Sequence, residues 1–166
     1  MPKIIKDGAV VDDHWNLMAI PEDTSTSVGS IEENTLIPLS IWLTQKSSIG
    51  KRDNIGVWLN SDDAVESLAD DLSKLSVIAI NFPTFMDGRG FSSARLLRER
   101  YDYRGEIRAI GYVIRDQLCY LKRCGFNAFT LQPEVNLTDA LSSLEDFTES
   151  YQTSVDQQNP LFRRRA

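Results

Sequence analysis

The chain has 166 residues, of which 42% are hydrophobic and 25% are charged, a size and composition typical of one globular domain. Its longest apolar runs, such as residues 77–80, are far shorter than the roughly 20 residues that cross a bilayer, which excludes a membrane-spanning helix. The net charge of −6 disfavours general nucleic-acid binding, because a phosphate backbone requires a basic surface.

The N-terminus, the two cysteines and the distribution of charge give expectations for the compartment and the redox state of the protein. The N-terminus soon reaches the charged Asp7 and lacks the long apolar core of a secretion signal, so we expect a cytoplasmic protein. Cys119 and Cys124 are spaced for neither a CxxC motif nor a disulfide staple, and we expect both to be reduced. Residues 89–123 carry a charge of +5, which leaves −11 on the rest of the chain.

The N-terminal part of the chain predicts a hairpin, a loop and one helix. Asp7-Gly8 separates two short apolar runs, and this dipeptide favours the positive φ values of a tight hairpin turn. Residues 21–35 are rich in Ser, Thr, Glu and Asp, a composition typical of a mobile loop. Pro38 suits the first turn of a helix, whose apolar side would include Leu39, Trp42 and Leu43.

From residue 54 onward, short β-type runs alternate four times with amphipathic stretches. The predicted strands are 55–59, 77–81, 107–110 and 128–131. The first predicted helix is capped by Asp62 and runs to Leu75, and the second is capped by Ser92 and runs to about Tyr101. The third runs from Ile114 and stops at Gly125. The fourth has one apolar side, made of Leu137, Leu141, Leu144 and Thr148.

Four βα units with apolar strands predict an α/β fold with a mostly parallel sheet, because parallel strands need crossover connections. The sheet is either an open, flavodoxin-like layer or a half-barrel, and both put ligands at the C-terminal ends of the strands. We expect a single domain over residues 1–166. It would comprise the hairpin and mobile loop (1–35), the βα core (36–151) and a frayed basic tail (152–166).

The loop between the second predicted strand and its helix is the strongest site candidate. Its glycines permit close approach of the backbone, and the helix start that follows attracts anions. The alternative is a structural turn in which Asp87 caps the helix and the arginines are solvated. The residues predicted to bind an anion or a partner here are Asp87, Gly88, Arg89, Gly90, Ser92, Ser93, Arg95 and Arg98.

The same loop resembles a dinucleotide fingerprint only in part. Ser93 replaces the third glycine, and no convincing ribose-binding acid follows the next strand, which disfavours classical nicotinamide binding. The nearby Phe82, Phe85 and Phe91 favour packing under the loop over stacking on a flavin. The sequence therefore assigns no cofactor.

A second group of candidate site residues lies on the third predicted strand and at the start of its helix. Arg108, Arg115 and Gln117 are further candidates for anion or partner binding. Asp116 is a weak catalytic candidate, because an acid in the first turn of a helix commonly serves the helix dipole alone. His14 is the only histidine, and one histidine does not make a transition-metal site, so we expect no bound metal.

Five motifs together resemble a known bacterial family. They are Asp87-Gly88-Arg89-Gly90-Phe91-Ser92, Arg95-Leu96-Leu97-Arg98, Gly105-Glu106-Ile107-Arg108-Ala109, Arg115-Asp116-Gln117 and Arg123-Cys124-Gly125-Phe126. The family consists of small proteins described as probable oxidoreductases of sulfite reduction and encoded alongside assimilatory sulfite reductase. The similarity extends from about Leu36 to Tyr151. The family pattern has an aspartate after the glycine that is Gly111 here, where this chain has Tyr112.

The resemblance implies a role in reducing sulfite to sulfide, and three modes of action are open. An enzyme or carrier would hold a small anion at the Gly88 loop. An accessory protein would use the same arginines to dock sulfite reductase or an acidic electron-transfer protein such as a ferredoxin. A structural protein would complete its sheet by forming a homodimer.

Overall fold

The computed structural model describes residues 1–20, 31–49 and 54–164. Much of the predicted mobile loop, residues 21–30, and the last two residues of the predicted tail lie outside the described residues. Within the described part, no helix is both long and apolar enough to cross a membrane.

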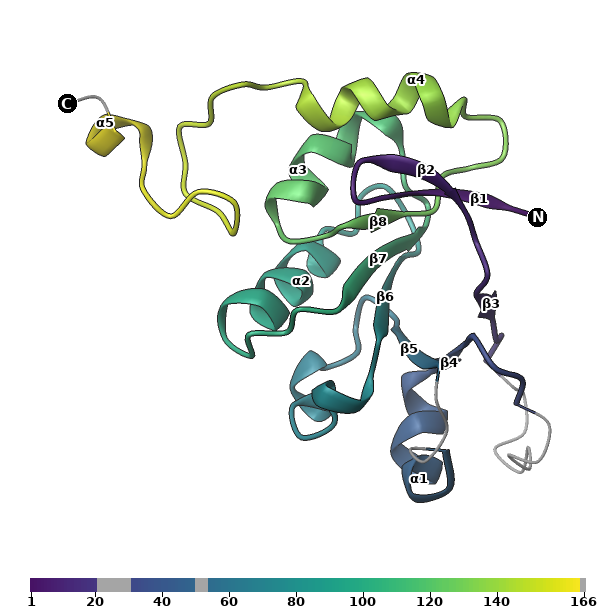
Figure 1. The fold of residues 1–166 in the computed structure, drawn as a ribbon. Helices are drawn as coiled ribbons and strands as arrows, with labels where there is room; N and C mark the ends of the chain where they lie inside the picture. The colour runs from purple at the N-terminus through teal and green to yellow at the C-terminus, as the bar shows by residue number, and fades with distance from the viewer. Residues whose placement is uncertain (21–30, 50–53, 165–166) are drawn as a thin grey trace.

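One mixed sheet organises the chain, with the spatial order β2-β1-β8-β7-β6-β5-β4-β3 (Figure 1). The strands from β8 to β3 pair in parallel, whereas β1 pairs antiparallel with both β2 and β8. The strands are β1 (Lys3–Lys6), β2 (Ala9–Asp12), β3 (Asn16–Leu17), β4 (Thr35–Pro38), β5 (Ile55–Leu59), β6 (Val77–Phe82), β7 (Glu106–Gly111) and β8 (Ala128–Phe129).

The predicted N-terminal hairpin is confirmed. Lys6 and Ala9 are paired across a two-residue turn, in which Asp7 has a φ of 49° and Gly8 a φ of 78°. These are the positive values that the turn requires.

The connection between the two edge strands forces the sheet to curl. β2 and β3 lie at opposite edges, yet only residues 13–15 join them. A flat sheet of eight strands would separate its edges by about 34 Å at about 4.8 Å per strand. The four Cα–Cα steps from Asp12 to Asn16 span at most about 14 Å. The sheet is therefore a half-barrel, and Figure 1 shows the connection closing its open side.

Helices cover the outer face of the half-barrel. Alternate strand residues such as Val57, Ile78 and Ile80 are fully buried against helix residues that include Trp42 and Leu97. This alternation follows from the pleat, which sends successive side chains to opposite faces. The helices are α1 (Leu39–Ile49), α2 (Arg89–Glu99), α3 (Leu118–Arg123), α4 (Leu137–Leu141) and, at the end of the C-terminal arm, α5 (Leu161–Arg164).

The inner face holds a smaller apolar cluster. It is covered by Trp15, from the connection that closes the half-barrel. The buried members of the cluster are Leu36, Trp58, Val77, Ala79 and Ile110.

The predicted α/β class is confirmed, but the prediction of a mostly parallel sheet built from about four βα units is wrong. The sheet is mixed and has additional strands, because the hairpin joins its β8 edge and β3 and β4 extend the other edge. β4 was not predicted, since Pro38 indicated a helix start. In the structure Pro38 is the last residue of β4, and α1 begins one residue later.

Predicted helices also differ from the structure. The last one is shorter than predicted, because α4 ends at Leu141 and a 3₁₀ turn, Ser142–Glu145, follows, so Thr148 lies beyond both. The stretch from Val65 to Leu75 forms two short 3₁₀ helices, Val65–Leu68 and Leu72–Lys74, separated by the buried Asp71. α2 begins at Arg89 and not after Ser92. Its first turn starts early because the Asp87 carboxylate accepts the backbone N–H of Arg89 at 3.2 Å.

Candidate functional site

The predicted loop after β6 lies at the C-terminal edge of the sheet and forms a local ion pair. Arg89 donates from Nε and Nη2 to the two oxygens of Asp87, at 3.0 and 2.7 Å, and from Nη2 to Ser61 Oγ at 2.9 Å. The hydrogen bonds from Arg89 and Ser61 hold the pKa of Asp87 well below its usual range. The Arg89 side chain is 60% exposed, but Asp87 already occupies two of its donor nitrogens.

The small residues of this loop have packing and surface roles. A Cβ on Gly90 would lie 2.8 Å from the Phe82 ring, so a glycine here lets the start of α2 pack directly on β6. Gly88 precedes the helix as its cap. Ser92 is exposed, and Ser93 donates from Oγ to the Arg89 carbonyl at 3.5 Å.

Arg98 is a half-buried structural link between three segments. It donates to the carbonyl oxygens of Tyr103, Gly105 and Gly125 at 2.6, 2.9 and 2.9 Å, and to Asn127 Oδ1 at 3.3 Å. Burial lowers the pKa of Arg98 below its ordinary value. Within the described residues it pairs with no carboxylate.

The second predicted group of site residues does not come together, because its members lie on opposite faces of the sheet. Arg115 donates to Ser143 Oγ at 2.6 Å and to Ser142 Oγ at 3.2 Å, and so links the start of α3 to the segment after α4. Gln117 accepts the backbone N–H of Ile114 at 3.3 Å, as a helix-capping residue does. Asp116 is exposed in this same turn. Arg108 lies on the inner face of β7, away from all of them.

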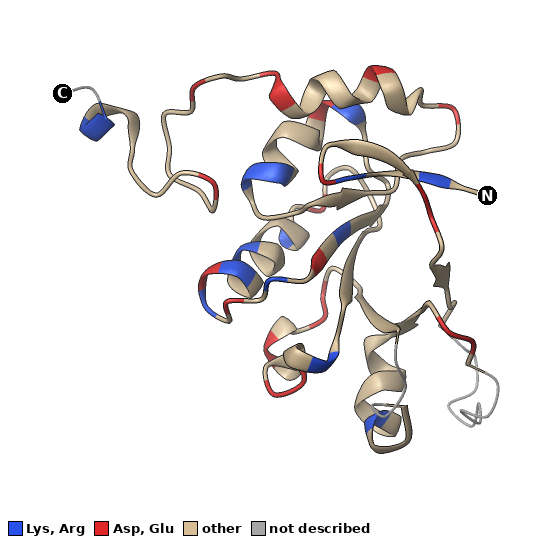
Figure 2. Cartoon of the chain, viewed as in Figure 1, with Lys and Arg blue, Asp and Glu red and all other residues tan. Residues whose placement is uncertain are grey.

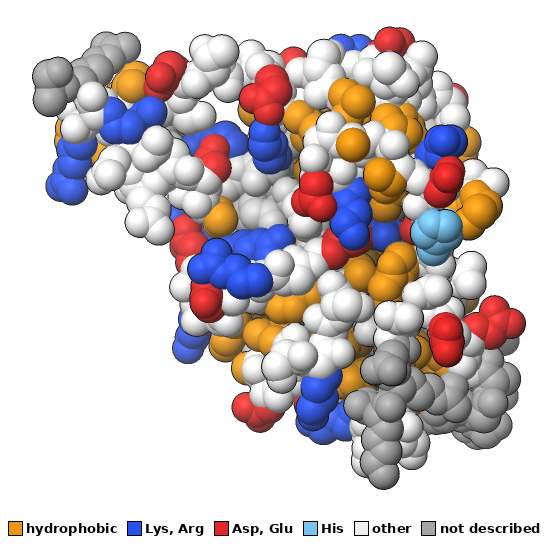
Figure 3. All heavy atoms as spheres, in the orientation of Figure 1, with side chains coloured by type: hydrophobic (Ala, Val, Ile, Leu, Met, Phe, Trp, Pro, Cys, Tyr) orange, Lys and Arg blue, Asp and Glu red, His pale blue; other side chains and the backbone are white. Residues whose placement is uncertain are grey.

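Three arginines do converge, on the outer surface of α2. Arg95, Arg98 and Arg104 line a hollow of about 490 Å³, closed on its other side by residues 153–155 and 158 of the C-terminal segment. Figure 2 shows the basic residues of α2 and α3 near this segment, and Figure 3 shows Lys and Arg side chains gathered over α2. We call this surface the α2 basic face and define it as Arg95, Arg98, Arg104 and Arg123 together with Tyr120.

Tyr120 and Arg123 were not singled out from the sequence. Tyr120 is 53% exposed, and its ring stacks at a tilt on Phe91 of α2 with the centroids 5.0 Å apart. Arg123 donates to the Gln152 carbonyl at 2.7 Å and pairs with Asp156, which fixes the C-terminal segment against α3. The sequence feature that pointed to this surface was the high density of arginines between residues 89 and 123.

The expectation that both cysteines are free thiols agrees with the structure, in which Cys119 and Cys124 are buried and unbridged. Burial raises the pKa of the Cys124 thiol, which disfavours the reactive thiolate.

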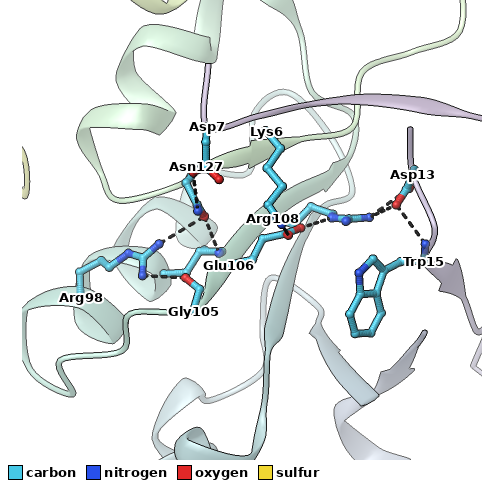
Figure 4. Close-up of polar contacts among 10 residues, drawn as sticks. Lys6, Asp7, Asp13, Trp15, Arg98, Gly105, Glu106, Arg108 and Asn127 are labelled. Carbon is cyan, nitrogen blue, oxygen red and sulfur yellow. Dashed lines mark hydrogen bonds and ion pairs between the residues drawn. The ribbon is translucent and has the colours of Figure 1, made fainter. Parts of the chain in front are cut away.

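A buried ion network lies on the inner face of the half-barrel (Figure 4). Arg108 donates from Nε to Glu106 at 2.7 Å and from Nη1 to both oxygens of Asp13, at 2.9 and 3.0 Å. Lys6 pairs with the second oxygen of Glu106 at 2.7 Å. The sequence identified Arg108 but not its partners, because Lys6 and Asp13 come from the hairpin and the connection, far away along the chain.

The family model for bacterial proteins of unknown function, DUF934, matches residues 56–162, which is more than half of the chain. The chain belongs to this family. No curated protein matches it. The DUF934 match contains the whole α2 basic face together with Glu106 and Arg108, whereas Lys6 and Asp13 lie before it.

Proposed function

We propose that this DUF934 protein is an accessory protein of assimilatory sulfite reduction that docks an acidic redox partner through the α2 basic face. The family resemblance seen in the sequence supplies the pathway. The partner would be sulfite reductase or an acidic electron-transfer protein such as a ferredoxin. An oxidoreductase activity of the chain itself is the alternative that the resemblance implies.

The observation that carries the proposal is the gathering of Arg95, Arg98 and Arg104 around one hollow. Glu99 and Asp102 neutralise Arg95 and Arg104. Arg98 remains without a carboxylate partner in the described part of the chain, so the hollow retains positive charge on a protein whose net charge is −6. A basic region on an otherwise acidic protein orients and accelerates encounter with an acidic partner.

The composition of the face also fits a protein interface. Arginine and tyrosine are enriched where proteins bind each other, because each combines a large contact area with hydrogen-bonding groups. Here Tyr120 lies between α2 and Arg123, with half of its surface exposed. Its packing on Phe91 holds the ring in place before a partner arrives.

The test is direct binding to purified sulfite reductase and to ferredoxin, measured by biolayer interferometry at low and at high salt. We expect the Arg95→Glu, Arg104→Glu double variant to bind at least about tenfold more weakly, and the wild-type affinity to fall with salt. Arg89→Glu is the matched control, because Arg89 is also ion-paired and its exposure of 60% lies between the 46% of Arg95 and the 80% of Arg104, but it lies at a different edge. Weakening by Arg89→Glu alone would assign docking to the loop after β6 and overturn the proposal.

The same hollow favours a second candidate function, the capture of a small oxyanion. Arg98 has no carboxylate partner among the described residues, so sulfite, sulfate or adenosine phosphosulfate would find positive charge there. A ligand that binds the native state raises the melting temperature. A rise of several degrees that Arg95→Glu, Arg104→Glu abolishes would support anion capture, and a rise that only Arg89→Glu abolishes would place the anion at the Gly88 loop.

A further inference from the structure

A groove of about 540 Å³ opens on the inner face of the half-barrel, across the sheet from α2. Its apolar part comes from the hairpin, and its wall is the connection that closes the half-barrel. The buried ion network forms its floor (Figure 4). The lining residues used below are Ile4, Lys6, Ala9, Val11, residues 12–15, Glu106 and Arg108.

Two hydrogen-bond donors in this groove are unused. Arg108 is 98% buried, since only 2% of it is exposed, and its bonds to Glu106 and Asp13 occupy Nε and Nη1. Its Nη2 has no partner among the described residues, and neither has the indole N–H of Trp15. Neither nitrogen is fully enclosed, so both can bond to water or to the oxygen acceptors of a ligand in the groove.

The charge of the groove decides which acceptors fit. Lys6 and Arg108 face four lining carboxylates, those of Asp7, Asp12, Asp13 and Glu106, which gives a net charge of −2 with His14 neutral. A negative charge disfavours oxyanions and favours neutral acceptors carried by a positively charged ligand. The carbonyl groups of a basic peptide meet both conditions.

The free edge of β2 supplies the matching backbone groups. Lys6 pairs with Ala9 beside a two-residue turn, so the N–H and C=O groups of Val10 and Asp12 point away from β1. In the described sheet β2 has no other neighbour. An extended segment pairing with this edge would gain main-chain hydrogen bonds, as in β-strand addition.

The C-terminal arm of this protein carries a segment of that chemistry. α5 comprises Leu161, Phe162, Arg163 and Arg164, two apolar residues followed by two basic ones. Phe162 is 62% exposed, and the single helical turn is held by the ion pair of Arg164 with Glu149 at 2.9 Å and by the bond from the Leu161 N–H to the Tyr151 carbonyl at 3.1 Å. Exchange of the arm would replace these contacts. Figure 1 places α5 away from the sheet, on the side opposite the hairpin, so a second copy of the chain is the natural acceptor.

We propose that the inner groove binds the α5 segment of a second copy of this chain as an added strand on β2. Phe162 would pack on Val11 and Ile4, and the two arginines would neutralise the acidic wall. Reciprocal exchange of arms gives a closed, twofold dimer. The groove and the α2 basic face lie on opposite faces of the sheet, so peptide binding in the groove can be measured separately from partner docking.

The decisive experiment is fluorescence anisotropy with a labelled peptide of residues 157–164 and the full chain. We expect saturable binding that Val11→Arg weakens at least tenfold, because the longer side chain fills the groove. Leu43→Arg is the matched control, an apolar-to-arginine change on α1 at a position that is 43% exposed, and it should bind like the wild type. Absence of peptide binding, or equal binding by the Val11→Arg variant, would overturn the proposal.

Exchanging the charges of the peptide and of the groove tests the proposal even if the Val11→Arg variant fails to fold. The peptide with Arg163→Glu and Arg164→Glu should not bind the wild-type groove. It should bind the Asp12→Arg variant better, since this exposed site changes the groove charge from −2 to 0. In sedimentation velocity, the full chain should form a dimer that Arg163→Glu, Arg164→Glu converts to monomer. A dimer unaffected by these changes would place the contact elsewhere.

Discussion

Two glycines with positive φ differ in what surrounds them. Gly111 ends β7 with a φ of 86°, and a Cβ there would lie 2.2 Å from Asn81 Oδ1 and 2.6 Å from the Phe82 carbonyl. Gly8, in the hairpin turn, has a φ of 78°, and a Cβ there would have no atom within 4 Å among the described residues. Both positions therefore carry backbone strain for other residues, but only Gly111 adds a steric clash.

We predict that Gly111→Ala lowers the free energy of unfolding by about 3 kcal/mol and that Gly8→Ala lowers it by about 1 kcal/mol. The first value combines left-handed strain with the displacement of Asn81, whereas the second contains strain alone. Urea denaturation at neutral pH measures both. Equal losses in the two variants would show that the neighbours of Gly111 relax freely.

At the residue scale, the sequence identified unusual residues but not their partners. Arg98 and Arg108 are both in predicted site motifs, yet one bonds to carbonyl groups between α2 and β8 and the other to an ion network inside the sheet. The density of charge along the sequence indicates which segments carry the arginines. It does not indicate which face of a strand or helix they occupy relative to segments that are distant along the chain.

At the element scale, Asp71 determines how the segment between β5 and β6 folds. Its carboxylate accepts hydrogen bonds from Trp42 Nε1 at 3.2 Å, Lys46 Nζ at 3.0 Å and Lys74 Nζ at 2.7 Å. Burial alone would raise the pKa of Asp71, but the bonds from Lys74, Lys46 and Trp42 lower it below 3.8 overall. The ionised carboxylate therefore ties the two 3₁₀ helices to α1.

We predict that Asp71→Asn destabilises the protein by about 1–2 kcal/mol at pH 7, while Asp70→Asn, at the exposed neighbouring position, changes stability by less than about 0.5 kcal/mol. The folded pKa lies below the unfolded value of 3.8, so the contribution is complete above pH 3.8 and is lost as the pH falls through the folded value. Urea titrations across this range should show the wild type approaching the Asp71→Asn variant. A difference that persists at the acidic end would assign the loss to packing.

Apolar runs in the sequence predicted the strands well where both faces of the strand are buried. Residues 55–59 form the predicted strand, and 77–81 lie within β6. The helix predicted after Asp62 failed because the spacing of Val65, Leu68 and Leu72 also suits two 3₁₀ helices held by Asp71. Periodicity carries no information about a buried carboxylate whose partners lie in another helix.

At the scale of the whole molecule, the curl of the sheet depends on a connection that has no sequence pattern. Residues 13–15 join the two edge strands, and Asp13 binds Arg108 of β7 through both carboxylate oxygens. This ion pair crosses the inside of the half-barrel between segments 95 positions apart in the chain. It holds the connection over the inner cluster, against which Trp15 packs.

We predict that Asp13→Asn lowers the free energy of unfolding by about 3 kcal/mol, because it leaves a buried arginine with one fewer charged partner. The Arg108 and Asp13 side chains are only 3% and 10% exposed, so solvent screens the pair weakly. Asp12→Asn is the matched control. Asp12 is the preceding residue and is 52% exposed, so its ion pair with Lys3 at 3.4 Å should contribute less than about 0.5 kcal/mol.

A double-mutant cycle with Arg108→Met separates the ion pair from other effects of each substitution. If the pair closes the half-barrel, Asp13→Asn should cost little once Arg108 is removed, and the coupling energy should account for most of the single-variant loss. Additive losses would instead mean that Asp13→Asn acts on the connection itself, by weakening the charge-assisted bond that Asp13 Oδ1 accepts from the Trp15 backbone N–H at 3.1 Å. The curl would then depend on the local turn at Asp13 and Trp15.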